Sequence, residues 1–186
     1  QPLLTRSIED AQNKDKSIVL LSNAEYSIML NSLGSGYSSL KDMMLYRWKG
    51  DSTSDSSGMF FYIKNLNSNE YWSASFEPCK TYGDEYNVNL NIDKPQFNRK
   101  DGNIETTTQV SVSYDENFEV RKITLKNNGL KGRSIEITSY MEIILTSFSA
   151  DAVHPAFSNL FVQTEYDEEQ KVVIGSRRGR VKDAKV

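Results

Sequence analysis

The run TTTQVSVSY, at residues 106–114, alternates side chains that suit a protein interior with polar ones. A second run, YNVNLNID at residues 86–93, sets Tyr, Val, Leu and Ile against Asn and Asp with the same period. Successive side chains of a β-strand point to opposite faces, so a period of two predicts strands with one buried and one solvated face. Ile, Met and Leu at alternate positions of residues 135–145 predict one further, long strand.

Turn signals separate these runs. Asp101-Gly102 and Asn128-Gly129 predict hairpins, because these pairs adopt the positive φ angles of tight turns. The apolar phase slips between Val120 and Ile123, which predicts a β-bulge. Only residues 6–14 show a brief helical pattern. Together these features predict an all-β fold, a large antiparallel β-sandwich of many strands whose edges carry Lys and Asn side chains.

Length and charge set the limits of this fold. With 186 residues the chain is one domain, or one domain and a fragment, and we expect a linker at 1–16 and the sandwich at 17–186. A net charge of −3 argues against a nucleic-acid partner, and no apolar run approaches the ~20 residues of a membrane helix. The single Cys79 excludes an internal disulfide framework and points to a reducing compartment. The first residue, Gln1, suggests a piece excised from a longer protein.

The run from Leu20 to Asp55 consists of two short strand-like pieces, a Gly-Ser-Gly-Tyr-Ser turn and an aromatic-basic segment that leads into a polar loop. Gly34 and Gly36 allow positive φ where the backbone turns sharply. Tyr46, Arg47 and Trp48 offer ring faces and a planar guanidinium, which suit sugar rings and their hydroxyls. The alternative is that Tyr46 and Trp48 pack on one face of a strand as part of the core.

Four blocks of the sequence carry a family resemblance: LLSNAEYSIML at 20–30, GSGYS at 34–38, YRWKGDSTSD at 46–55 and ADAVHPAFSNLFVQTE at 150–165. They resemble the N-terminal domain of the inverting phosphorylases of glycoside hydrolase family 94, formerly glycosyltransferase family 36. Within it they are most similar to cyclic β-1,2-glucan synthases and 1,2-β-oligoglucan phosphorylases. Two positions depart from the pattern: Ala24 stands where the family has Gly, and Ser57 stands where we expect an aromatic residue.

The resemblance implies a supersandwich of the galactose mutarotase type, truncated before a helical linker and an (α/α)6 barrel that holds the catalytic acid. The parent enzyme would convert a β-glucan and inorganic phosphate into α-glucose 1-phosphate, with no cofactor and no metal, and no catalytic residue is expected in this chain. The implied partners are a β-glucan oligosaccharide, the downstream barrel and a second copy in a homodimer. The implied location is the cytoplasm, or the cytoplasmic side of a membrane-anchored parent.

The resemblance also implies which residues meet the sugar. The loop at 46–55 would reach the substrate, with Tyr46, Arg47 and Trp48 shaping the site and Asp51 and Asp55 orienting hydroxyls.

Two residues outside this loop, Tyr37 and His154, complete the candidate set. His154 is the sole histidine, so neither a catalytic triad nor a multi-histidine metal site can be built, and a structural His bonded to backbone is its alternative. Arg177, Arg178 and Arg180 offer charge for phosphate, against a solvated strand end or an interdomain contact. Two other function classes remain open: a free-standing carbohydrate-binding module and a structural sandwich without ligand.

Overall fold

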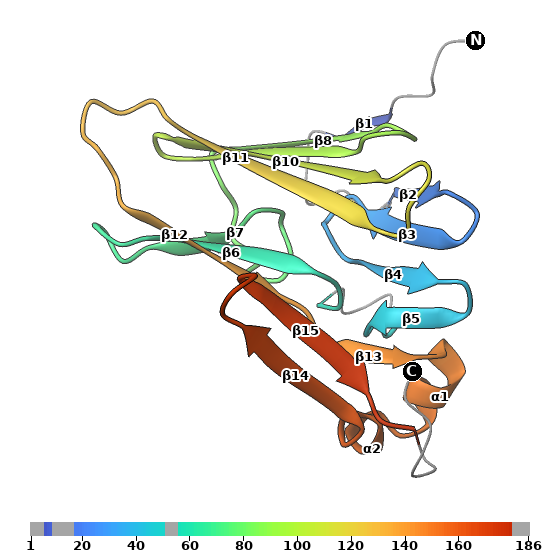
Figure 1. Ribbon diagram of the computed structural model, residues 1–186. Coiled ribbons are helices and arrows are strands. Elements are labelled where there is room, and N and C mark those ends of the chain that lie inside the picture. The colour runs from blue at the N-terminus through green and yellow to red at the C-terminus, as the bar shows by residue number, and fades with distance from the viewer. Residues whose placement is uncertain (1–5, 9–16, 51–55, 180–186) are drawn as a thin grey trace.

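Two layers of antiparallel strands face one another in the computed structural model, which describes residues 6–8, 17–50 and 56–179 (Figure 1). One layer is a five-stranded sheet, here sheet A, with strand order β1-β8-β9-β10-β11. The other layer contains sheet B, ordered β13-β5-β4-β3-β2, and sheet C, ordered β12-β6-β7. A separate hairpin, β14-β15, lies beside β13. The predicted antiparallel, almost entirely β architecture is confirmed.

The element boundaries follow the chain. Sheet A contains β1 (Arg6–Ile8), β8 (Glu85–Leu90), β9 (Gln96–Asp101), β10 (Ile104–Val112) and β11 (Glu119–Asn127). Sheet B contains β2 (Ile18–Ser22), β3 (Tyr26–Asn31), β4 (Gly36–Leu40), β5 (Met43–Tyr46) and β13 (Ile143–Thr146). Sheet C contains β6 (Phe60–Asn65), β7 (Tyr71–Ser73) and β12 (Ile135–Tyr140). The rest are α1 (Phe148–Val153), α2 (Pro155–Asn159), β14 (Val162–Asp167) and β15 (Val172–Arg177).

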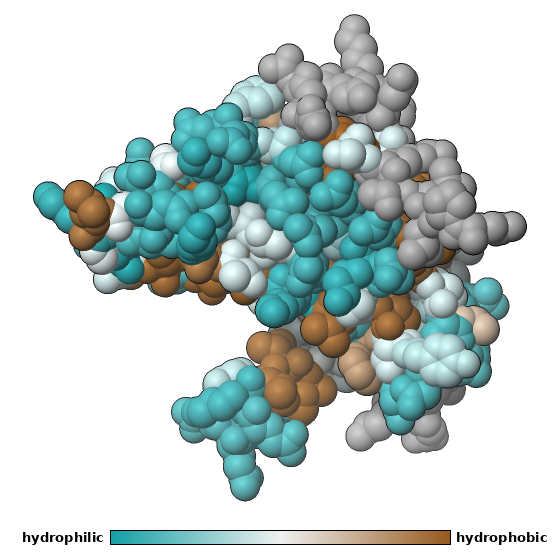
Figure 2. All heavy atoms as spheres, turned by 90° about the horizontal axis from the view of Figure 1, so that it is seen from above, coloured by the Kyte–Doolittle hydropathy of each residue, from teal (hydrophilic) through white to brown (hydrophobic). Residues whose placement is uncertain are grey.

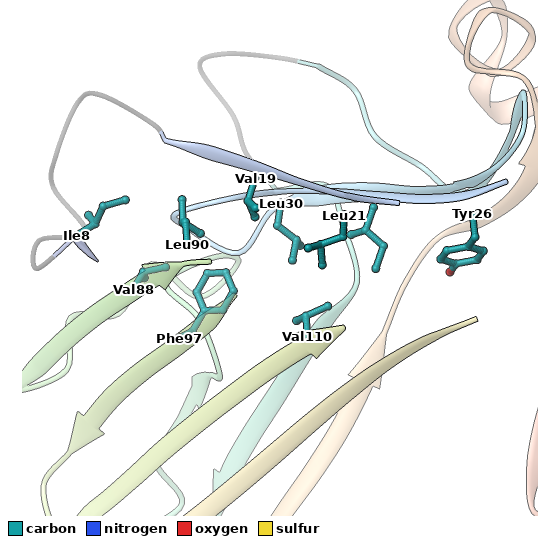
Figure 3. Close-up of a cluster of buried hydrophobic side chains, with 10 residues drawn as sticks. Ile8, Val19, Leu21, Tyr26, Leu30, Val88, Leu90, Phe97 and Val110 are labelled. Atoms are coloured by element: carbon teal, nitrogen blue, oxygen red, sulfur yellow. The ribbon is translucent and has the colours of Figure 1, made fainter. Parts of the chain in front are cut away.

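The main core lies between sheets A and B. Figure 3 shows side chains of the two sheets pointing toward one another, with Val19, Leu21 and Leu30 from sheet B and Val88, Phe97 and Val110 from sheet A. A smaller core between sheets A and C is built from Ile63, Trp72, Ala74 and Ile104. Burial of these apolar side chains supplies the driving force that holds the two layers together.

The period-two pattern corresponds to real strands. Along β10, Thr106, Thr108 and Val110 are buried while the residues between them are half-exposed. The polar residues of the same strands cover the outer face of sheet A, which is largely hydrophilic when seen from above (Figure 2). The predicted turn at Asp101-Gly102 is the β9–β10 hairpin, in which Gly102 has φ +58°.

The bulge predicted near Val120 is wrong. Pairing between β10 and β11 runs without a register shift from Ile104–Asn127 to Val112–Glu119. The apolar phase slips because an ion pair occupies inward-facing positions: Glu119 and Arg121 point between the layers, while Val120 is 48% exposed on the outer side.

Two other predictions in the second half of the chain are corrected. Asn128-Gly129 does not close a hairpin, because β11 belongs to sheet A and β12 to sheet C. The strand expected over 135–145 is two strands, separated at Met141 and Glu142 where the chain passes from sheet C to sheet B. At this break the carbonyl of Glu142 accepts a hydrogen bond from the backbone N–H of Arg47 (2.8 Å), which holds the connecting residues against the end of β5.

The amino-terminal residues also differ from expectation. Arg6–Ile8 is strand β1, paired with β8, and not the start of a helix. The expected linker over 1–16 therefore includes a strand of sheet A, and Ile8 belongs to the main core.

The backbone geometry at three small residues explains local sequence features. Gly34 has φ +95°, as expected, whereas Gly36 is needed for space because a Cβ there would lie 1.8 Å from the carbonyl oxygen of Met29. Ala24, in the β2–β3 turn, has φ +81°, a conformation that glycine adopts at lower cost. Ala24 therefore occupies a turn position whose backbone conformation favours glycine.

Candidate functional site

The candidate site lies where β5 ends and meets the two short helices. Arg47, one residue beyond β5, is only 7% exposed, and its guanidinium points at α1 and α2. Nε and Nη2 donate to the two carboxylate oxygens of Asp151, both at 2.8 Å, in a bidentate pair. Nη1 donates to Glu142 (2.5 Å), and Nη2 also donates to Asn159 Oδ1 (2.7 Å). Arg47 therefore ties the end of β5 to both helices.

The local sequence explains why the helices begin and end where they do. The hydroxyl of Ser147 accepts a hydrogen bond from the backbone N–H of Ala150 and so caps the first turn of α1. His154 separates the helices, and Pro155 occupies the first position of α2, where its missing N–H costs nothing. Asp151 lies within the first turn of α1, facing inward toward Arg47.

The electrostatics of this pair favour both charges. Burial alone would raise the pKa of Asp151, but the hydrogen bonds and positive charge of Arg47 outweigh it and lower that pKa below its ordinary value. Hydrogen bonds to Asp151 raise the pKa of Arg47. A buried charge is tolerated only when it is paired and hydrogen-bonded, and both conditions hold here.

An aromatic cluster lies beside this ion pair. The Trp48 ring is 5.3 Å from Tyr37 and 6.1 Å from Phe148, measured between ring centroids. Trp48 and Tyr37 are half-buried and Phe148 is 45% exposed, so part of the cluster faces solvent. A Cβ at Gly50 would lie 3.4 Å from the Trp48 indole, so the chain turns closely over this ring. We call Tyr37, Trp48 and Phe148 the aromatic corner.

Tyr46 lies elsewhere. It is 2% exposed, and its hydroxyl contacts Ser38 Oγ (2.8 Å) and accepts from Arg121 Nη2 (2.8 Å). Since Ser38 and Tyr37 are successive residues of β4, their side chains point to opposite faces of sheet B. Tyr46 contacts Ser38 and Trp48 contacts Tyr37, so Tyr46 and Trp48 lie on opposite faces of sheet B. The strand alternation does not extend to Trp48, because β5 ends at Tyr46. The two side chains therefore do not share one core face.

His154 lies at the junction of α1 and α2, with an exposed side chain. Its backbone carbonyl accepts the N–H of Ser158 (2.9 Å). The residue borders a cavity of about 540 Å³, lined also by Val153, Phe157 and Arg177. Arg177 donates to the carbonyls of Ile144 (2.8 Å) and Ser158 (3.2 Å), so its guanidinium is held by the protein and the phosphate alternative gains no support. His154 and the Arg47 pair therefore belong to the same corner of the molecule.

Comparisons with known proteins identify the family of the chain. A family model for the glycosyl hydrolase 94 supersandwich domain matches residues 2–186. The chain belongs to this family. It is 34% identical over 175 residues, 94% of its length, to the cyclic β-(1,2)-glucan synthase NdvB of Rhizobium meliloti (strain 1021). It is 23% identical over 115 residues, 62% of its length, to solabiose phosphorylase of Paenibacillus borealis. It is also 23% identical over 132 residues, 70% of its length, to N,N′-diacetylchitobiose phosphorylase of Vibrio proteolyticus.

The supersandwich chain spans a small part of each relative: 6% of the glucan synthase, 14% of solabiose phosphorylase and 16% of the diacetylchitobiose phosphorylase. Neither described helix has the length or apolar character required to cross a lipid bilayer. Within the described residues, His, Cys, Asp and Glu side chains do not gather in threes around a position for a metal ion.

Sequence reasoning found some of the corner and missed the rest. Trp48 and Tyr37 do lie together, whereas Asp51 and Asp55 fall outside the described residues. Phe148, Glu142 and Asp151 were not singled out. Asp151 was present in a quoted block, and a buried arginine needs a carboxylate, but only the fold shows that Arg47 is buried.

Proposed function

We propose that this chain is the non-catalytic N-terminal sandwich of a carbohydrate-active enzyme, either an inverting β-glucan phosphorylase or a cyclic β-1,2-glucan synthase. In that enzyme a downstream (α/α)6 barrel supplies the catalytic acid, and inorganic phosphate attacks the glucan. The sandwich shapes the sugar site and contributes to the subunit interface of a homodimer. Family membership and the 34% identity to a glucan synthase support this assignment.

The single observation that carries the site proposal is the convergence of three separated blocks. Tyr37 comes from the block at 34–38, Trp48 from 46–55 and Asp151 from 150–165, and they meet at one corner. An aromatic face with a solvent-exposed edge suits stacking against the apolar face of a pyranose ring. The sugar would therefore contact Trp48 and Phe148 first.

The role of Arg47 follows from its partners. Its donors already bind Asp151, Glu142 and Asn159, so we assign it to holding the corner in place. Direct binding of sugar hydroxyls by Arg47, expected from its chemistry, would compete with these bonds. Arg47 is accordingly a positioning residue, and Trp48 is the residue whose loss should affect substrate.

The test is kinetic and uses the intact enzyme that contains this domain. Replacing Trp48 by Ala should lower kcat/KM for phosphorolysis of β-1,2-glucan about ten-fold, since an aromatic contact is worth roughly 1.5 kcal/mol. The Phe variant, which keeps a ring, should recover most of this loss. Lys49→Ala, a change at an exposed neighbour, is the matched control.

Unfolding temperatures are measured alongside the kinetics. Unchanged kinetics of the Trp48→Ala enzyme would remove the aromatic corner from the sugar site. Equal losses of activity and stability would make Trp48 a packing residue only. The 186-residue chain alone should release no glucose 1-phosphate from β-1,2-glucan, and its release would contradict the non-catalytic assignment.

A further inference from the structure

A second cavity, of about 440 Å³, lies away from the aromatic corner, and it shares no lining residue with that corner. The walls come from three segments: the β6–β7 hairpin, residues 81–84, and the β9–β10 turn. Arg133, from the segment between β11 and β12, completes the lining. The volume falls within the roughly 300–1,000 Å³ typical of small-molecule sites.

Two exposed tyrosines stand at this cavity. Tyr71 and Tyr82 are both 64% exposed, although large aromatic side chains are usually buried well beyond this. The ring of Tyr82 is held from behind by Phe76, at 5.2 Å between centroids, and Phe76 itself is 9% exposed. A fixed, solvent-facing ring is suited to stack on the apolar face of a flat ligand.

Carboxylates accompany the tyrosines, and the fold fixes their positions. Asp101 accepts two hydrogen bonds from Arg99, at 2.7 and 2.5 Å. Asp84 accepts one from the backbone N–H of Gly102 (2.8 Å). A carboxylate has about four acceptor sites, so each retains capacity for a hydroxyl of a ligand.

Further hydrogen-bonding capacity is unused in the lining. The indole N–H of Trp72 and the hydroxyl of Thr81 are buried and have no hydrogen-bond partner in the described part of the chain. Buried polar groups in native proteins are nearly always satisfied by protein, water or ligand.

The charge of the lining selects the ligand class. Among the described residues that border the cavity, Glu70, Asp84 and Asp101 are acidic and Arg133 is basic. A phosphate or another anion would meet net repulsion there. A neutral ligand rich in hydroxyls, with apolar ring faces, matches both the carboxylates and the tyrosines.

We propose that this cavity binds a neutral saccharide, as a second carbohydrate site distinct from the aromatic corner. The preference for a saccharide comes from the lining alone. The choice of a β-1,2-glucan as its natural ligand rests on the proposed function. Such a site would hold one part of a glucan chain on the sandwich while another part is processed elsewhere.

Calorimetric titration of the 186-residue chain with a linear β-1,2-linked glucose oligomer tests the proposal. Saturable binding is expected, and Tyr82→Ala should weaken it about ten-fold or more, the loss expected for an aromatic anchor. Tyr166→Ala is the matched control, because Tyr166 is 58% exposed on β14 and lies outside the cavity. The melting temperature of each variant is checked in parallel.

Several outcomes would overturn the second site. These are no binding at millimolar oligomer, tighter binding of inorganic phosphate than of the oligomer, or binding that Trp48→Ala abolishes and Tyr82→Ala leaves intact. The kinetic test of Trp48 in the whole enzyme is independent. Its failure would leave the calorimetric result for Tyr82 unchanged, so the two proposals fail separately.

Discussion

The side chains of Arg47 and Arg121 are only 8% and 6% exposed, and each binds a carboxylate that is little exposed, but the two arginines differ in what they hold together. Arg121 pairs with Glu119, two residues away on the same strand (2.8 Å), and this pair bonds Tyr46 and Ser38 across the gap between the layers. Arg47, just beyond β5, binds partners that are distant in sequence, in the two helices and at Glu142. Arg121 thus helps to hold the two layers together. Arg47 attaches the two helices of the candidate site to sheet B.

The largest effect is expected at Arg121. Replacing it by Met should lower the free energy of unfolding by about 3–5 kcal/mol, because Glu119 would remain buried without its cation. Denaturant titration measures the change, with Lys122→Met on the exposed side of the same strand as the control. A loss below about 0.5 kcal/mol, the range of ordinary surface substitutions, would show that the pair does not support the core.

Arg47→Met should cost less, about 3 kcal/mol, because one of its acceptors, Glu142, has a side chain that is 46% exposed and can be hydrated. Lys49→Met is the matched control. The double variant Arg47→Met/Asp151→Leu should recover part of the loss, since no buried charge is then left alone. Equal stabilities of the single and double variants would contradict the ion pair as the cause.

Acid should weaken the contribution of the Arg47–Asp151 pair to stability. The pKa of Asp151 is lowered in the folded protein, so the unfolded chain takes up the proton first as pH falls. The stabilisation that ionised Asp151 gives to the folded state is therefore complete above the ordinary aspartate pKa of about 3.9. It is lost as pH falls toward the lower pKa that Asp151 has in the folded protein. The free energy of unfolding, followed from pH about 6 to 3, should drop more steeply in the wild type than in Asp151→Asn. Parallel curves would refute this linkage.

The smallest effect is expected in the turn that leads into Tyr26, whose hydroxyl donates to Glu119, the partner of Arg121 (3.2 Å). Ala24 has φ +81°, where glycine carries no Cβ strain. Ala24→Gly should raise the free energy of unfolding by up to about 1 kcal/mol, after the extra chain entropy of glycine is subtracted. Ala152→Gly in α1 should instead lower the free energy of unfolding by about 1 kcal/mol. Destabilisation by Ala24→Gly would mean that the strain is absent.

The sequence predicted the fold well where one face of a strand is apolar. Along β8 and β10 the alternation alone identified the buried face correctly, because burial selects side chains by position. The alternation pattern failed to identify the buried face where polar side chains point between the two layers. Glu119 and Arg121 look like surface residues in the sequence, so the buried face of β11 was hidden.

The candidate site was less accessible to sequence reasoning for a related reason. Trp48 was proposed from its chemistry and Tyr37 from the GSGYS block of the family resemblance, and the structure brings their two rings together. The partners of Arg47 could not be found, because Asp151 is 104 positions away and local patterns carry no information about such a contact. The cavity at Tyr82 is equally a product of four segments, which are spread over residues 65–133.

The sequence distance between Arg47 and its partners also determines when their contacts can form during protein synthesis. The hydrogen bonds from Arg47 to Glu142 and Asn159 close loops of 95 and 112 residues. A ribosome adding about 5–20 residues per second needs roughly 5–20 s to supply those partners after Arg47 has been made. During that interval β2 to β5 can pair as successive hairpins, while the Arg47 guanidinium remains in water. The corner around Arg47 can therefore be completed only after every strand of sheets A, B and C has been synthesised.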